Sequence, residues 1–333
     1  MRLLQNQIGP AVTLLNARSL FPKIDELKVV SSLKSPDLIC VTETWLNETV
    51  DSCLIDIPGF VVCRDDRSYR RGGGVAVFLR SNLCFHNITA MYELPDAIDC
   101  LVIDITSFNL LFLCLYVPPS LCSDKLKDIY DSIIRVFDNF LVMKPHYHQM
   151  MVGDFNSFDV KSLCFDLDLH DLIVKPTREN AILDHIIVSK ELSQSYDVNK
   201  VIYDAPLGTS DHLMLTCYPS DVLPKTSHGL RYHKLYDFRQ SNMDKLFYHC
   251  CQMDWMSLVQ SVNGVDQKLH IFLDCLMSLF VKCIPCTYIP MTSNDKGWIT
   301  PLTKHLINER WAAYRAKDWN RYNFLKNKVR QEK

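Results

Sequence analysis

The sequence predicts a layered α/β fold for residues 1–219, followed by a mostly helical extension over residues 220–333. Three observations lead to this prediction. Short apolar segments alternate with turns through the first part, two amphipathic helices interrupt them, and helical periods replace the alternation beyond Ser220. We therefore place a domain boundary near Ser220, with 1–219 as one domain and 220–333 as an extension.

Nine segments of the first part have the length and the β-branched or apolar content of strands. They cover residues 11–15, 38–42, 59–64, 74–79, 98–105, 109–116, 148–152, 184–188 and 213–217. Helices are expected over residues 23–33 and 125–142, where apolar residues recur at three and four positions on one face. Beyond the boundary, helical periods cover residues 242–250, 265–281 and 303–330.

The composition is that of a folded protein, with 48% hydrophobic and 22% charged residues among 333. The net charge of −2 conceals an asymmetry. Residues 1–219 hold 19 Lys and Arg against 28 Asp and Glu, whereas residues 220–333 hold 17 against 10. An acidic first part can bind a cation and a basic tail can bind phosphate, although either can also be solvated surface.

The 14 cysteines lie mostly in apolar segments, where a thiol acts as a small core residue, so we expect reduced thiols. Cys283 and Cys286 have C-x-x-C spacing, but no second pair follows at zinc-finger distance, which favours a buried helix over a zinc site. The N-terminus has no signal pattern, and no apolar segment reaches the roughly 18 residues that a membrane span needs. We expect an intracellular protein that does not engage a membrane.

Polar residues stand at the ends of the expected strands, where layered α/β proteins usually build their sites. They are Asn16, Glu43, Asp154, Asn156, Asp184, Asp211 and His212. Each has a simple structural explanation when taken alone, as a turn residue, a cap or a satisfied core imidazole. Together they exceed what core packing requires, so their order and spacing carry the functional prediction.

In order and spacing, these segments resemble the endonuclease/exonuclease/phosphatase superfamily over nearly all of residues 1–219. Asn16 matches the N-terminal Asn motif, Glu43 the metal-ligand Glu and Tyr116 the mid-domain Tyr. Residues 153–156 match the G-D-x-N motif, and residues 210–212 match the terminal S-D-H. The resemblance implies a four-layer α/β/β/α sandwich of the DNase I-like kind.

Three further segments look like those of endonucleases carried by non-LTR (LINE-type) retrotransposons. They are residues 16–20, the glycine-rich run 70–77 and residues 183–186. Residues 297–301 and the basic helix ending at Arg330 look like the segment that leads to the reverse transcriptase of such elements. The chain stops inside this expected helix, so we expect a truncation before any reverse transcriptase domain.

The resemblance implies a Mg²⁺ site, with Mn²⁺ as an alternative. It assigns Glu43 as the hard oxygen ligand, with Asn16 and Asp211 holding the ion or its waters. Many repair enzymes of the superfamily carry an acidic residue two positions after the Asn, and here that position is Arg18. The missing carboxylate argues against two metals and against abasic-site repair.

The resemblance also implies the catalytic roles. Asp154 orients and deprotonates the attacking water, and Asn156 holds both Asp154 and a phosphate oxygen. His212 faces the phosphate with Asp184 as its acidic partner, although the adjacent His185 is a rival for that carboxylate. Tyr116 donates a hydrogen bond to the same phosphate.

Four residues are candidates for DNA binding: Arg18, Trp45, Arg70 and Arg71. Arg70 and Arg71 lie with Arg64 and Arg67 in a polar turn before three glycines, a geometry suited to phosphate contact. A basic hairpin loop explains the same pattern equally well, and Trp45 fits packing as well as stacking.

The sequence thus predicts a Mg²⁺-dependent DNA endonuclease that nicks one strand for retrotransposon integration and acts in the nucleus. A phosphatase or an abasic-site repair nuclease of the same superfamily is the alternative within enzymes. A catalytically dead remnant that only binds nucleic acid or protein is the alternative from another class. DNA is the expected partner, with element RNA a further one for the basic C-terminal helix, and the sequence leaves the oligomeric state unknown.

Overall fold

The computed structural model describes all residues except 1–8, 68–71, 221–230, 292–298 and 333. Contacts divide the chain into two units. The first unit comprises Met1–Ser227 together with Glu309–Lys328, and the second comprises His228–Asn308 and Val329–Lys333. The first unit, which carries all the candidate catalytic residues, therefore recruits a segment from near the end of the chain.

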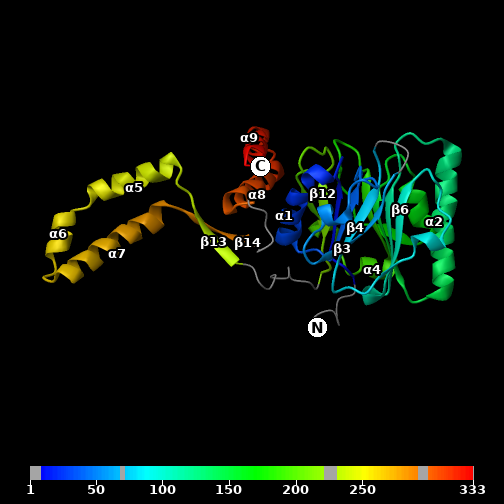
Figure 1. Ribbon diagram of the computed structural model, residues 1–333, viewed down its shortest axis with the longest axis horizontal. Coiled ribbons are helices and arrows are strands. Elements are labelled where there is room, and N and C mark those ends of the chain that lie inside the picture. The colour runs from blue at the N-terminus through cyan, green and yellow to red at the C-terminus, as the bar shows by residue number, and fades with distance from the viewer. Residues whose placement is uncertain (1–8, 68–71, 221–230, 292–298, 333) are drawn as a thin grey trace. The chain divides into compact units, whose positions relative to one another are not determined.

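A six-stranded mixed sheet forms one layer of the first unit (Figure 1). Its strands, in spatial order, are β11 (Ile202–Asp204), β12 (Met214–Cys217), β1 (Val12–Asn16), β2 (Leu38–Thr42), β4 (Val75–Arg80) and β3 (Phe60–Asp65). Strands β1 and β2 run parallel, and the other pairs are antiparallel. The polar ends of β1 and β2 are therefore at the same edge of this sheet.

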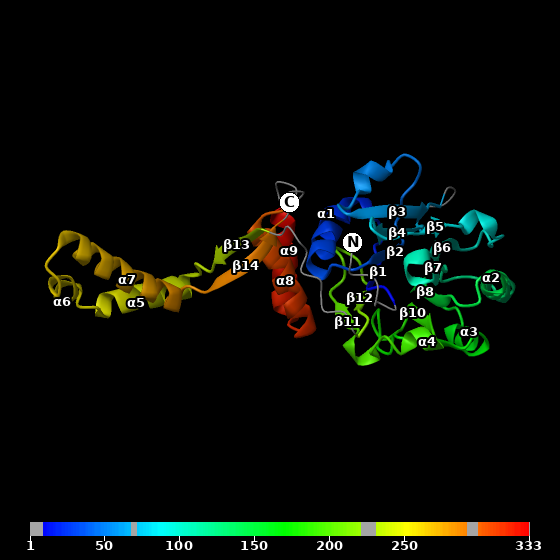
Figure 2. The same ribbon diagram turned by 90° about the horizontal axis from the view of Figure 1, so that it is seen from below.

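A second six-stranded sheet packs face to face against the first (Figure 2). Its order is β5 (His86–Asn87), β6 (Asp99–Ile105), β7 (Leu110–Tyr116), β8 (His148–Asp154), β10 (Asp184–Ser189) and β9 (Leu169–Asp171). Strands β7 and β8 are the parallel pair here. Strands β1, β2 and β7 of the two central parallel pairs are buried along their whole length and are mostly apolar, as strands covered on both faces are.

Helices cover the outer faces of the two sheets (Figure 2). α1 (Ile24–Lys34) lies on the first sheet, and α2 (Ser123–Met143) and α3 (Val160–Asp166) lie on the second. Short helices occupy Phe21–Lys23, Ser52–Ile55, Thr89–Met91, Thr106–Phe108, Lys190–Ser193 (α4) and Val198–Lys200. The result is the four-layer α/β/β/α sandwich that the sequence predicts.

Alternation along the strands builds two apolar layers from one chain. In β7, Phe112 and Cys114 point into the layer between the sheets, whereas Leu111 and Leu113 point toward α2. The helix contributes its own apolar face, which recurs at three and four positions and includes Ile133. Both faces of β7 are therefore packed up to its last residue, Tyr116, where the candidate site begins.

The second unit contains a two-stranded ribbon and helices. The ribbon pairs β13 (Arg231–Tyr236) with β14 (Cys286–Met291), and α5 (Gln240–Gln252), α6 (Trp255–Gln260) and α7 (Val265–Cys283) lie between them in sequence. α8 (Pro301–Arg315) and α9 (Trp319–Gln331) follow and supply the segment that joins the first unit.

The observed elements correct some details of the prediction. The nine expected strands and both early helices are present within two residues at each end, but β5, β9, β11 and the ribbon are additional. The expected helix over 303–330 is two helices, because residues 316–318 form a turn. Cys283 is buried at the end of α7 as expected, whereas Cys286 lies exposed in β14, so the helical interpretation is wrong for it. No helix among the described residues is long and apolar enough to cross a membrane.

Candidate active site

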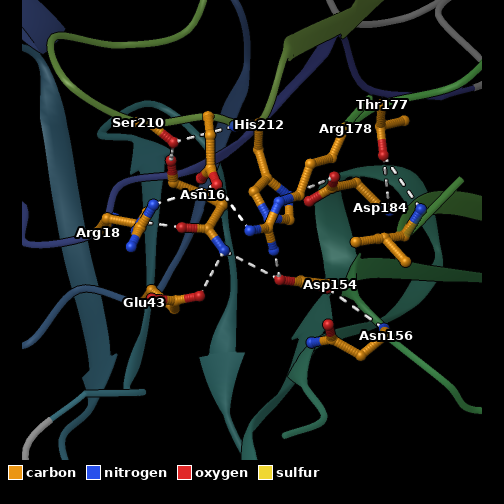
Figure 3. A network of polar contacts seen from close by, with 12 residues as sticks. Asn16, Arg18, Glu43, Asp154, Asn156, Thr177, Arg178, Asp184, Ser210 and His212 are labelled. Atoms are coloured by element: carbon orange, nitrogen blue, oxygen red, sulfur yellow. Dashed lines mark hydrogen bonds and ion pairs between the residues drawn. The ribbon is translucent and has the colours of Figure 1, made fainter. Parts of the chain in front are cut away.

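Strands from both sheets bring polar residues to one edge of the sandwich, among them Asn16, Asp154 and Asp184 (Figure 3). Parallel pairing sets Asn16 beside Thr42, the residue before Glu43, and sets Tyr116 beside Asp154. β10 is antiparallel to β8, so its first residue, Asp184, pairs with Asp154 at the same edge. Strand direction and register alone therefore gather residues that lie as far apart in the chain as 16 and 184.

A glycine permits the close pairing of β7 and β8. A Cβ at Gly153 would lie 2.0 Å from the carbonyl oxygen of Leu115 in the neighbouring strand. No side chain fits there, so the glycine of the G-D-x-N motif serves the backbone approach that positions Asp154.

Asn16 connects the two sheets through its side chain. It is fully buried, and its Nδ2 donates to Glu43 Oε1 and to Asp154 Oδ2, both at 2.9 Å. Its Oδ1 accepts from the backbone N–H of Arg18 at 3.1 Å. Glu43 Oε2 accepts from Trp45 Nε1 at 3.2 Å. Asn16 therefore fixes the distance between two carboxylates that belong to different sheets.

Asp154 is a buried carboxylate with a perturbed pKa. Besides Asn16, it accepts the backbone N–H of Asn156 at 3.2 Å, and Asn156 is itself fixed by donating to Val117 O at 2.8 Å. Burial is the main cause that raises the Asp154 pKa to about 7, and the negative charge of Asp184 adds to it. A carboxylate with a pKa near neutrality is suited to general-base work.

His212 pairs with Asp184. Its Nδ1 lies 2.7 Å from Asp184 Oδ2, while its Nε2 lies 4.0 Å from Asp154 Oδ2, and all three side chains are buried. Burial lowers the imidazole pKa, but the hydrogen bond and charge of Asp184 outweigh it, so the His212 pKa is raised overall. The rival, His185, contacts Asp171 Oδ2 through its Nδ1 at 2.6 Å instead.

Asp211, which is partly exposed, forms ion pairs with two arginines, Arg18 and Arg178. Its Oδ2 is 3.1 Å from Arg18 Nη1 and 2.8 Å from Arg178 Nη2. Burial alone would raise the Asp211 pKa, but the two guanidinium groups outweigh it and lower the pKa. Both arginine side chains remain 40% exposed or more, so each has N–H groups available to an anionic ligand.

Tyr116 and Asp184 are on opposite sides of Asp154, because β7 and β10 flank β8 in the sheet. Burial, together with the negative charges of Glu43 and Asp154, raises the Tyr116 pKa well above its usual value, so its hydroxyl is a proton donor at any physiological pH. Arg67 lies 5.5 Å from the Tyr116 ring centre and forms a bidentate ion pair with Asp99. A cavity of about 970 Å³ opens beside this pair, lined in part by Pro118.

The predicted role of the basic turn in DNA binding is not supported for two of its arginines. Arg64 bonds to Asp66 and to two backbone carbonyls, and Arg67 pairs with Asp99, so both serve the loop structure. Arg70 and Arg71, the two predicted DNA-binding residues of this turn, lie outside the described residues. Trp45 is half-buried against Glu43.

Two groups of residues could hold a divalent cation. Among the described residues, one ligand atom each from Asp154, Asp184 and His212 lie within 4.8 Å of one another, and this is the cluster with metal-site geometry. The predicted set of Glu43, Asn16 and Asp211 combines two carboxylates with an amide, and it stays a prediction. Its carboxylates nevertheless fit a hard cation, because Glu43 is only half-buried and Asp211 Oδ1 is a buried acceptor without a hydrogen-bond partner among the described residues.

Unusual backbone conformations accompany the site. Arg18, Ser19, Glu43, Trp45 and Asn156 all have positive φ, between 40° and 78°. Residues of this kind avoid the left-handed region unless the surroundings hold them there, and such residues concentrate at functional sites. All five lie within three residues of the ends of β1, β2 and β8, in the turns that carry the polar residues of the site.

Several residues of the site carry no signal in the sequence. Thr177 Oγ1 accepts the backbone N–H groups of Leu183 and Asp184, and Arg178 pairs with Asp211. Lys23 is buried and donates to the carbonyl oxygens of Ala17 and Arg18, the latter at 2.7 Å. In the sequence, these are ordinary turn and helix residues, because their partners are known only once the fold is known.

Comparison with known proteins agrees with this architecture. Among solved structures, the 3′ phosphatase NExo from Neisseria, bound to product DNA hairpin, is similar with a TM-score of 0.50 and 14% identity, over 64% of this chain and 100% of that one. The endonuclease domain of TRAS1, a telomere-specific non-LTR retrotransposon, has a TM-score of 0.49 and 15% identity, over 63% and 97%. A mannosyl-6-phosphatase from Bacteroides thetaiotaomicron has a TM-score of 0.46 and 15% identity, over 63% and 99%.

No curated protein matches the sequence. The model of the Endonuclease/Exonuclease/phosphatase family, however, matches residues 14–212, which include every candidate catalytic residue from Asn16 to His212. Members of this family are usually hydrolytic nucleases or phosphatases and generally use divalent metal ions. The matched residues are well over half of the chain, and the chain belongs to the endonuclease/exonuclease/phosphatase family.

Proposed function

We propose that this protein is a Mg²⁺-dependent DNA endonuclease that nicks target DNA for the integration of a LINE-type retrotransposon. One observation carries the proposal of phosphodiester hydrolysis. Asn16 holds the carboxylates of Glu43 and Asp154 together, and the Asp184–His212 pair lies beside them at the same edge. This arrangement combines a cation ligand, a base and a phosphate-facing imidazole, which are the groups that a phosphodiester requires.

Asp154 is the general base in this proposal. Its two oxygens are oriented by Asn16 and by the Asn156 N–H, so the carboxylate cannot rotate away from the attacking water. With a pKa of about 7, a substantial fraction of Asp154 is ionised near neutral pH, and the carboxylate is basic enough to accept the water's proton. Asn156 orients Asp154 by this backbone contact, and its side chain is fixed to Val117 O.

His212 and Tyr116 act on the phosphate. Asp184 holds the Nδ1 proton of His212, which leaves Nε2 as the atom that donates to a phosphoryl oxygen. The raised pKa favours the imidazolium form, whose charge stabilises the anion. The Tyr116 hydroxyl stays protonated and donates a second hydrogen bond.

Glu43, with Asn16 and Asp211, would hold the divalent cation, which supplies charge neutralisation at the phosphoryl and leaving oxygens when bound. Glu43 is the ligand that we favour over the Asp154, Asp184 and His212 cluster. In that cluster, Asp184 already holds His212, and a cation on Asp154 would remove the base. Mn²⁺ offers the same hard coordination and should substitute for Mg²⁺.

A DNA substrate is favoured by the residues at the rim. Arg18 occupies the position where repair enzymes of the superfamily carry an acid, and it neutralises Asp211 together with Arg178. A pair of partly exposed guanidinium groups beside the base suits the phosphates that flank a scissile bond. The segments 16–20, 70–77 and 183–186 resemble LINE-type endonucleases, and they are the reason for preferring that source over repair.

A substrate panel tests the proposal. The full chain is incubated with supercoiled plasmid, with a duplex containing an abasic site, and with a small phosphomonoester, each with Mg²⁺ and with EDTA. We expect Mg²⁺-dependent conversion of the plasmid to open circles with 3′-hydroxyl ends. Preferential cleavage at the abasic site, or release of phosphate from the monoester alone, would assign the chain to the repair or phosphatase alternative. Inactivity on all three would favour the remnant.

A further inference from the structure

A segment from near the end of the chain is linked, through two carboxylates, to the loop that carries Ser210, Asp211 and His212. The segment Glu309–Lys328 belongs to the same unit as the sandwich, although Glu309 lies 97 positions beyond His212 in the chain. Its contacts with the sandwich include ion pairs and a cation–π contact between Lys34 and Trp311. The ion pairs involve two buried carboxylates, Glu26 in α1 and Asp204 in β11. Asp204 directly precedes the loop, and Glu26 accepts a hydrogen bond from Gly208 within it.

Glu26 joins the segment to the loop through a single oxygen atom. Its Oε1 accepts from Arg310 Nη2 and also from the backbone N–H of Gly208, the latter at 3.2 Å. The side chains of Glu26 and Arg310 are each 2% exposed. A buried carboxylate keeps its orientation only while its charge is balanced, so Arg310 determines how Glu26 presents its oxygen to Gly208.

Asp204 anchors the start of the same loop. It is fully buried, its Oδ1 accepts from Arg315 Nη1 at 2.6 Å, and its Oδ2 pairs with Lys34. Arg310 and Arg315 are both in α8, so one helix holds the loop at Asp204 and, through Glu26, at Gly208.

Hydrogen bonds within and around the loop connect Gly208 to the catalytic groups. Gly208 has a φ of +57°, and a Cβ there would lie 3.1 Å from the Lys23 side chain, which in turn bonds to the carbonyls of residues 17 and 18. Two residues on, Ser210 Oγ donates to Asn16 O at 2.7 Å and accepts from the His212 N–H at 3.3 Å. The path from Arg310 to His212 is therefore a continuous series of hydrogen bonds and short chain segments.

We propose that Arg310 and Arg315 of α8 are positioning residues for catalysis, which act through Glu26 and Asp204 on the loop 205–212. The proposal rests on the hydrolytic function proposed above. The domain that performs the chemistry then requires residues from the C-terminal extension, and it is incomplete when the chain is ended near residue 219.

The test compares three variants in the full chain. Arg310→Met removes the cation that pairs with Glu26. The double variant Glu26→Gln/Arg310→Met replaces the charged pair with a neutral acceptor for the Gly208 N–H. Arg321→Met is the control, because it removes an exposed cation of the same segment that pairs with Glu309. For each we measure kcat and KM for plasmid nicking, the melting temperature, and backbone amide exchange over residues 205–212.

We expect Arg310→Met to lower kcat about tenfold with KM changed less than about twofold, since small displacements of catalytic groups cost rate rather than binding. Exchange over 205–212 should accelerate. The double variant should recover most of kcat, and Arg321→Met should match the wild type. The proposal is overturned if Arg310→Met lowers only the melting temperature while kcat and exchange over 205–212 are unchanged.

The test also covers an Arg310→Met variant that does not fold and a wild type that does not nick DNA. If Arg310→Met does not fold, Arg310→Lys replaces it, because lysine keeps the charge but presents a different donor geometry. An intermediate kcat with faster exchange then supports the proposal, and wild-type values of both contradict it. If the wild type nicks no DNA, the proposed function has failed, and the exchange measurement still decides whether α8 positions the loop.

Discussion

His212 Nδ1 lies 2.7 Å from Asp184 Oδ2, and both side chains are almost completely buried. The chain offers a matched pair nearby, because His185 Nδ1 lies 2.6 Å from Asp171 Oδ2. Only the first pair belongs to the cluster that contains Asp154. Two carboxylate–imidazole pairs of similar geometry thus differ in whether they face the proposed scissile phosphate, which makes one the natural control for the other.

Asp184→Asn should lower kcat by about 10²- to 10⁴-fold, because the amide no longer stabilises the imidazolium or fixes its tautomer. The variant is measured by plasmid nicking beside Asp171→Asn, which should keep at least about half of the wild-type rate. Equal losses in the two variants would show that the Asp184 effect is structural.

The pH dependence of kcat/KM should be a narrow bell. Asp154 has to be ionised to act as a base, so activity should rise as the pH passes about 7. His212 has to be protonated, and its raised pKa places the falling limb above the ordinary imidazole value. Asp184→Asn removes the group that raises the His212 pKa, so its falling limb should move to lower pH. Rates of both proteins over pH 5–9 check this, and an unmoved limb in the variant contradicts the assignment.

Asp154→Asn should abolish nicking and stabilise the fold at alkaline pH. The folded state holds a proton on Asp154 up to a pH of about 7, whereas the unfolded chain releases it near the usual value of 3.8. The wild type therefore loses stability as the pH rises between these values, and an amide avoids that loss. In EDTA at pH 8, the melting temperature of the variant should exceed that of the wild type by about 3 °C or more, and the gain should vanish near pH 4. A lower melting temperature at pH 8 would contradict the burial argument.

Much of this fold follows from local patterns in the sequence. The strands of the central pairs are continuous apolar runs, and β2 spans Leu38–Thr42 as predicted. The four layers follow once two such sheets and the amphipathic α2 are recognised. The short strands β5, β9 and β11 were missed because two or three residues carry no detectable period.

The site is predictable only in part for a physical reason. Asn16, Glu43, Asp154 and His212 stand at strand ends, so their location follows from strand direction. The contacts of Arg178 with Asp211 and of Arg310 with Glu26 depend on tertiary packing, and the second pair is separated by 284 positions. The electrostatic environment that raises the pKa of Asp154 likewise exists only after burial.

Gly153→Ala should destabilise the protein strongly, because the added Cβ would overlap Leu115 O and separate β7 from β8. We expect a loss of about 3 kcal/mol or more in the free energy of unfolding, at the upper end of overpacking effects. Gly59→Ala is the control. A Cβ at Gly59 meets nothing within 4 Å, so this variant is destabilised only by the positive φ of 81° that alanine would have to adopt. Chemical denaturation of both variants separates the steric effect from the conformational one. Equal losses in the free energy of unfolding would contradict a steric role for Gly153.

Arg18→Ala and Arg178→Ala should weaken DNA binding rather than chemistry. Each exposed guanidinium that contacts a phosphate contributes about 0.9 to the slope of log affinity against log salt concentration. Binding to a nicked duplex in EDTA, titrated from low to high salt, should show a slope reduced by about one for each variant. Lys200→Ala, an exposed cation that pairs with Asp197, should leave the slope unchanged. Unaltered slopes for the arginine variants would remove them from the interface.

The most direct test of the central claim is nicking of supercoiled plasmid with and without EDTA by the wild type, Asp154→Ala and His212→Ala, with His185→Ala as the control. We predict Mg²⁺-dependent open circles for the wild type and His185→Ala, and no nicking by folded Asp154→Ala or His212→Ala. Nicking by both of these variants at the wild-type rate would show that the hydrolytic site lies elsewhere.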